Sequence, residues 1–192
     1  GLLVLCKKSL EVEKQIRDWL YNFVIDLNLC PFVRSVISDK SMRIAVYESS
    51  DLKKIIDSFL FELNLIQSVD QVEVSTTLMV LPNSLSDFDE YLSFIDLAEE
   101  LMAEVGLEGI IQLASFHPKY QFEGESADSV SHFTNRSPYP IVHFLREDMV
   151  TQAINNFDKP ESISAKNIRT LEVMGLNEIR RRMSFKTQDV FN

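Results

Sequence analysis

The chain has 192 residues, of which 45% are hydrophobic, and this is enough for one domain built around a single core. Its 29 acidic residues outnumber its 19 basic residues, and a net charge of −10 disfavours nucleic acid and anionic membranes as partners. The two cysteines, Cys6 and Cys30, are too few for a disulfide framework, and no apolar run is as long as a membrane span. We therefore expect a cytoplasmic protein.

The first half of the chain alternates between helical and strand patterns. Apolar residues at helical spacing predict a first helix that starts near Val12 and ends at 28–31, where a proline disfavours the helical conformation. A β-like run at 43–47 precedes a second helix, for which Asp51 is the expected cap. The apolar, β-branched run 76–81 predicts a strand that is covered on both faces.

The second half begins with a third helix, which Ser84 or Ser86 can cap and Gly106 can terminate. The remaining expected elements follow in order: a strand at 109–115, a loop at 116–140, a strand at 141–145, a helix at 148–157, and a last helical region at 161–183 with a break at Gly175.

The central order of elements is therefore β-α-β-α-β-loop-β. Strands joined through helices run parallel with right-handed crossovers. We predict a single α+β domain with its core at about 11–183. Its mixed sheet of about four strands would carry packed helices, with helices added at both termini. A ferredoxin-like arrangement is one option, and the sequence does not define the strand order.

All three histidines of the chain lie between His117 and His143, in or beside the long loop at 116–140. A loop of this length inside a compact domain is uncommon and is often functional. His117 directly follows a predicted buried strand, and ligand sites gather at the carboxyl ends of such strands. We predict that His117 is an acid or base. The alternative is a histidine that is only hydrogen-bonded at a strand end.

The far end of the same loop carries polar groups that suit an anionic ligand. The planar guanidinium of Arg136 can hold a carboxylate or phosphate through two parallel hydrogen bonds. Asn135 and Tyr120 would orient the same small molecule, and Ser137 and Tyr139 would complete the binding site. In the alternative, the segment only fixes the loop, and Arg136 pairs with one of the many internal carboxylates.

Cys30 has two interpretations, which depend on the helix that contains it. If Cys30 ends the first helix, the helix dipole and burial raise its pKa and leave an inert thiol. If Pro31 instead begins a following helix, Cys30 becomes its N-cap. The thiolate is then favoured, and Cys30 could act as a nucleophile with His117 in thiol-based acyl or group transfer.

Two other functions fit parts of this pattern. A metal site could use the three histidines with Glu123, Glu125 or Asp128, but no pair has the spacing of a zinc motif, so we predict no metal. No cofactor motif is present either. The loop aromatics could instead form a protein-interaction or dimer surface, which leaves the oligomeric state open. They are Phe116, Tyr120, Phe122, Phe133 and Tyr139.

The basic run 180–182 lies late on the last predicted helix. Cations suit the negative end of a helix dipole, so the run is interpreted as a solvated helix end.

Four segments carry a resemblance to a known family. They are Leu-Asn-Leu-Cys-Pro-Phe at 27–32, Thr-Thr-Leu-Met-Val-Leu-Pro at 76–82, Ser-Phe-His-Pro-Lys-Tyr-Gln-Phe at 115–122 and Asn-Arg-Ser-Pro-Tyr-Pro at 135–140. With them, the chain resembles the uncharacterised family known as domain of unknown function 1415. The resemblance implies a soluble, mostly bacterial protein, and it transfers no activity, cofactor or catalytic residue. His132 is not expected from the family pattern.

Overall fold

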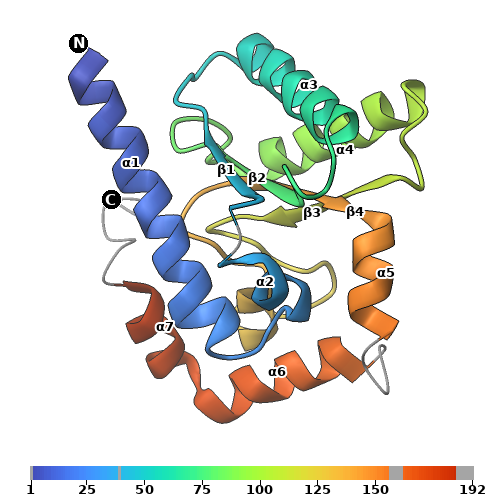
Figure 1. Cartoon of the computed structure of the whole chain (residues 1–192). Coiled ribbons are helices and arrows are strands. Elements are labelled where there is room, and N and C mark those ends of the chain that lie inside the picture. Colours follow the sequence, from blue (N-terminus) through green and yellow to red (C-terminus); the bar gives the residue numbers. More distant parts are fainter. Residues whose placement is uncertain (1, 39, 156–161, 185–192) are drawn as a thin grey trace.

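The computed structural model describes residues 2–38, 40–155 and 162–184. Figure 1 shows a sheet between two groups of helices. The elements in chain order are α1 (Leu2–Trp19), the π-helix η1 (Leu20–Ile25), α2 (Pro31–Val36), β1 (Met42–Val46), α3 (Leu52–Ser68), β2 (Thr76–Val80), α4 (Phe88–Glu104), β3 (Ile111–Phe116), the 3-10 helix η2 (Val130–Thr134), β4 (Ile141–Arg146), α5 (Glu147–Asn155), α6 (Ser162–Met174) and α7 (Leu176–Ser184).

The helix ends follow local chemistry. The carboxylate of Asp51 accepts a hydrogen bond from the Lys53 amide and caps α3, as predicted. The predicted serine cap of α4 is wrong, because Asp87 accepts from the Glu90 amide instead. Gly106 ends α4 with a φ of 76°, a left-handed conformation that glycine adopts without strain.

The sheet has the order β1-β2-β4-β3. β1 and β2 are parallel, and β4 lies antiparallel to both β2 and β3. The three strands joined through helices thus run in one direction, as predicted, and the α+β prediction is confirmed. The ferredoxin-like option is wrong, because that motif has the order β-α-β-β-α-β and here α4 separates β2 from β3.

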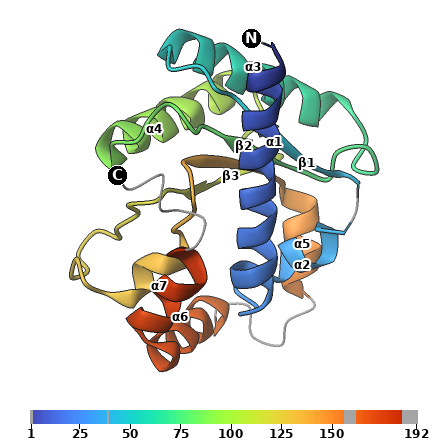
Figure 2. The same ribbon diagram turned by 90° about the vertical axis from the view of Figure 1, so that its left-hand side faces the viewer.

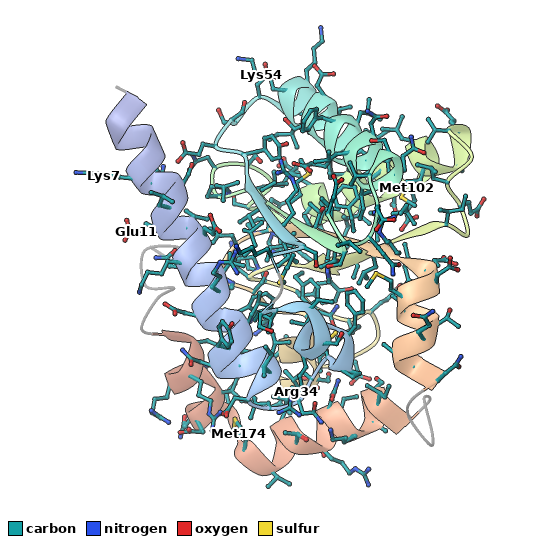
Figure 3. The ribbon with its side chains drawn as sticks, in the orientation of Figure 1. Lys7, Glu11, Arg34, Lys54, Met102 and Met174 are labelled. Carbon is teal, nitrogen blue, oxygen red and sulfur yellow. The ribbon has the colours of Figure 1, made fainter. Side chains whose placement is uncertain are left out.

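Each face of the sheet supports its own core. On one face, alternate residues such as Met79, Val142 and Phe144 pack with apolar residues of α3 and α4. On the other face, Leu78, Val80 and Ile141 pack with α1, η1, α6 and α7. Figure 3 shows side chains filling the space on both sides of the sheet. None of the helices in the described residues combines the length and apolar character needed to span a bilayer.

An ion pair between a partly exposed arginine and a buried carboxylate fixes α3 against the edge strand β1. Glu62 of α3 has 0% exposure and accepts hydrogen bonds from Arg43 Nε at 2.9 Å and Nη2 at 2.8 Å. The Tyr47 hydroxyl donates to the same carboxylate at 2.7 Å. The two parallel hydrogen bonds from the Arg43 guanidinium offset the free-energy cost of removing the Glu62 carboxylate from water. We therefore assign this ion pair to the scaffold.

Candidate functional site

The carboxyl ends of β2 and β3 and the start of β4 meet at one edge of the sheet, because β4 runs antiparallel between the other two. The hydroxyl of Tyr91, on α4, donates to the Ile141 carbonyl at 2.5 Å and accepts from the Phe116 amide at 3.0 Å. This buried bridge joins the end of β3 to the start of β4 beneath the long loop. The loop segments at this edge therefore start from a rigid base.

His117 lies at this edge, as the sequence predicted, and both of its ring nitrogens are occupied. The Lys119 amide donates to Nδ1 at 3.0 Å, which assigns the ring proton to Nε2, and Nε2 donates to the Leu85 carbonyl at 2.9 Å. The ring is fully buried against Phe88 and Tyr91. Burial is the main cause that lowers the pKa of His117 and favours the neutral ring. The geometry fits the structural alternative.

The other two histidines are also buried and hydrogen-bonded. His132 accepts from the Phe122 amide at 3.0 Å and donates to the Ser126 carbonyl at 2.7 Å, so it closes the loop on itself. His143, on β4, donates from Nε2 to Thr76 Oγ1 at 2.8 Å. Burial lowers the pKa of His143 to about 3. Among the described residues, no three His, Cys, Asp or Glu side chains are grouped so that they could hold a metal ion.

Cys30 is the N-cap of α2 with Pro31 in the first turn, which is the second of the two predicted arrangements. The thiolate expected with that arrangement is not favoured, because burial raises the pKa of the Cys30 thiol more than the backbone hydrogen bonds lower it. Cys30 packs beside Ala114 and Leu145 under α2 and α5. His117 contacts α4 on the other face of the sheet, so the structure does not bring the thiol and the imidazole together.

Asn135 ties the end of the loop to β3. Its Nδ2 donates to the Ser115 carbonyl at 3.0 Å, and its own carbonyl accepts from the His117 amide at 3.1 Å. Ser137 is buried and donates to the Tyr139 carbonyl at 2.6 Å, which closes a local turn. These two predicted ligand-binding side chains thus hold the loop in place.

Arg136 and Tyr120 lie together on the outer part of the loop. Arg136 Nε donates to the Tyr120 carbonyl at 3.0 Å, and its guanidinium carbon lies 4.5 Å from the centre of the Phe133 ring. The Tyr120 ring packs against Phe88 and Phe122. The predicted pairing of Arg136 with an internal carboxylate is absent from the described residues.

A cleft of about 350 Å³ lies between α1 and the edge of the sheet at which these strands end. Figure 2 shows α1 crossing in front of the sheet. The cleft is lined by Lys8, Glu11, Val12 and Gln15 of α1, by 82–84 and Ser86 after β2, by Pro118 and Lys119 after β3, and by Tyr139 and Pro140 before β4. The four α1 residues share one helix face because Glu11, Val12 and Gln15 follow Lys8 by three, four and seven positions.

Two contacts join the cleft's walls. Lys8 Nζ donates to Asn83 Oδ1 at 3.3 Å, and the Tyr139 hydroxyl donates to Gln15 Oε1. Ser84 Oγ is buried at this wall and has no hydrogen-bond partner in the described residues. An unsatisfied buried hydroxyl costs free energy, which a bound polar molecule would recover.

Of the predicted site residues, only Tyr139 lines this cleft. Sequence reasoning missed Asn83, Ser84 and Lys119, although each follows a predicted strand, and the rule applied to His117 applies equally to them. No sequence pattern indicated that Lys8 would line a cleft, since nothing in the sequence specifies where the first helix crosses the sheet.

The fold and this edge define a mixed α+β domain with a polar cleft at its strand ends. The chain belongs to the family described as protein of unknown function (DUF1415), whose model matches residues 11–181. No curated protein and no solved structure matches the chain.

Proposed function

We propose that this protein is a ligand-binding domain for a small, polar organic anion, held in the cleft between α1 and the strand ends. The observation that carries the proposal is the convergence of Lys8, Lys119 and the unpartnered Ser84 hydroxyl on one cleft of about 350 Å³. Ligand cavities commonly have this size and are common at the ends of strands.

The charge of the lining favours an anion. Lys8 and Lys119 face one carboxylate, Glu11, in a chain whose acidic residues outnumber the basic ones by 29 to 19. A local positive excess in a negatively charged protein attracts a small anion to this cleft in preference to the rest of the surface. A single excess charge fits a carboxylate rather than a multiply charged group.

The uncharged lining favours a ligand with hydroxyl or amine groups. Ser84 and Ser86 offer hydroxyls, and Gln15, whose Oε1 accepts from Tyr139, offers the N–H donors of its amide. These groups suit the body of a hydroxy acid or an amino acid. His117 lies behind this wall with both ring nitrogens used, so we assign it a positioning role and no proton transfer.

Two other cavities fit an anion less well. One, behind the loop after β2, is lined by the carboxylate of Glu90 and contains no cation. The other lies between α6 and α7 and is lined by Lys166, Arg169 and Arg182. It is more open to solvent than the cleft, and Arg182 is already paired with Glu178 and Asp26. The loop aromatics proposed as an interaction surface are all buried or half-buried, and no observation favours that alternative.

The test is a calorimetric titration with a panel of small hydroxy and amino carboxylic acids. Lys8→Gln and Lys119→Gln should each weaken binding of the acids that bind by about tenfold, the value expected for one lost charge-assisted hydrogen bond. Lys54→Gln is the matched control, since Lys54 is exposed on α3, on the other side of the sheet (Figure 3). Absence of binding across the panel, or equal weakening by Lys54→Gln, contradicts the proposal.

We also infer a cytoplasmic, bacterial setting. The support is the free thiol of Cys30 together with the family match. Cell fractionation of a bacterium that carries the gene tests this inference, and recovery in the periplasm or the medium contradicts it.

A further inference from the structure

A second cavity, of about 640 Å³, lies beyond the carboxyl ends of the parallel strands β1 and β2. Its walls come from Ser50 and Leu52 at the start of α3, from the loop 83–86 after β2, and from α4. Figure 1 shows α3 and α4 on the same side of the sheet. The Asn83 amide donates to the Glu48 carbonyl at 2.9 Å and joins the loops that follow the two strands. Ligand sites are common in such a crevice.

The α4 wall of this cavity is one amphipathic helix face. Ser93, Phe94 and Leu97 follow Glu90 by three, four and seven positions, and all four residues line the cavity. Glu90 and Ser93 are exposed, whereas Phe94 is buried and Leu97 is half-buried. Leu85, on the facing loop, packs against the same apolar core as Phe94. The cavity therefore has a polar rim and an apolar base.

The loop 83–86 separates this cavity from the cleft, because Asn83, Ser84 and Ser86 line both. Within the loop, Leu85 has a φ of 55°, a conformation that is uncommon for a bulky side chain. Such a conformation persists only where the surroundings fix it. His117 supplies one such contact, since its Nε2 donates to the Leu85 carbonyl at 2.9 Å. His117 thus helps to hold the common wall of the two cavities.

The charge of the second cavity is opposite to that of the cleft. Glu90 is the one titratable residue among the described residues that line it. The Glu90 carboxylate makes no hydrogen bond or ion pair within the described part of the chain. The remaining polar side chains include four serines, whose hydroxyl oxygens accept hydrogen bonds. A net charge of −10 on the whole chain also favours the approach of a cation.

We propose that this cavity binds an organic primary ammonium ion with an apolar body. The ammonium group carries three N–H donors, and the Glu90 carboxylate with the hydroxyls of Ser86 and Ser93 supplies acceptors at the rim. The apolar body covers Leu52, which is 51% exposed, and Leu97, and the burial of this apolar surface stabilises the complex. The inference goes beyond the proposed function, because it requires neither the lysines of the cleft nor a carboxylic acid.

An amide chemical-shift titration with phenethylamine at neutral pH tests this site. The largest shifts should fall at Ser50, Ser93 and Leu97, and Glu90→Gln should weaken binding by about tenfold. Asp89→Asn is the matched control, since it removes the same charge from the same turn of α4 and Asp89 does not line the cavity. Methylamine, which lacks the apolar body, should bind at least about tenfold more weakly than phenethylamine.

Four results would overturn the inference. They are no saturable shift at these three amides, weakening by Asp89→Asn equal to that by Glu90→Gln, binding of methylamine as tight as that of phenethylamine, and weakening of amine binding by Lys8→Gln. The second indicates an effect of bulk charge, the third an ion pair without an apolar contact, and the fourth places the amine in the cleft. Retention of amine binding in a Lys8→Gln variant that no longer binds carboxylic acids separates the two sites. Amine binding by a protein that binds no acid of the panel contradicts the proposed function alone.

Discussion

Replacement of His143 by glutamine should remove a defined part of the pH dependence of stability. The ring is completely buried in the sheet, and its Nε2 donates to Thr76, whose hydroxyl in turn donates to the Phe144 carbonyl at 2.6 Å. Burial lowers the pKa of His143 to about 3 in the folded protein, whereas an unfolded chain titrates near 6.5. The folded state therefore holds the neutral ring at pH values at which the unfolded state binds a proton.

The sign and size of the pH effect on stability follow from this difference in pKa between the folded and unfolded states. The stabilisation is fully present above about pH 6.5 and is lost as the pH falls towards the folded pKa, with a loss of about 2 kcal/mol at about pH 5. Urea unfolding, followed by the fluorescence of Trp19, measures the free energy of unfolding at about pH 8 and about pH 5. Trp19 is the single tryptophan and is buried.

His143→Gln keeps a donor for Thr76 but does not titrate, so its stability should fall by about 2 kcal/mol less than that of the wild type over the same pH interval. His117 and His132 are present in both proteins, and their contributions cancel in the comparison. Equal losses for the two proteins would show that His143 is protonated in the folded state, and would refute the assignment of a neutral ring.

Three further perturbations test the scaffold around the site. His117→Ala removes two hydrogen bonds and the ring packing of a buried residue. It should lower the free energy of unfolding, measured by urea unfolding, by about 3 kcal/mol. A change below about 0.5 kcal/mol contradicts the structural role of His117. Glu62→Gln should destabilise the protein by about 2 kcal/mol in the same assay, since the partly exposed Arg43 loses its charged partner. An unchanged midpoint of the urea transition would refute this prediction. In a Cys6→Ser background, Cys30 should react with iodoacetamide more slowly at neutral pH than free cysteine does, because burial raises the pKa of its thiol. A rate equal to that of free cysteine contradicts the raised pKa. Cys6 itself lies outside the residues whose side chains the structure describes.

The sequence predicted the elements well, because each rests on local patterns. The strands differ from their expected ranges by two residues or fewer at each end, and Gly175 separates α6 from α7 as its position suggested. The first helix starts ten residues earlier than its apolar pattern, at Leu2. The insertion of β4 between β2 and β3 depends on pairing across the sheet, and no local pattern specifies such pairing.

The sequence also drew attention to the edge of the sheet at which the cleft lies, although most of the side chains it singled out there do not line the cleft. His117, Asn135 and Ser137 form hydrogen bonds that hold the loop in place, and composition cannot distinguish such a role from ligand binding. Cys30 and His117 lie on opposite faces of the sheet. The position of Cys30 depends on how α2 packs, which no local sequence pattern specifies. Lys8 reaches the cleft only through the crossing of α1 over the strand ends.

The most direct test of the cleft is amide chemical-shift mapping with the tightest-binding acid of the carboxylate panel. If the cleft binds this acid, the largest shifts should fall at Asn83, Ser84, Ser86 and Lys119, and Lys8→Gln should reduce all of them. Shifts confined to other surfaces, or no shifts at any of these four amides at saturation, would contradict the assignment of the cleft as the binding site.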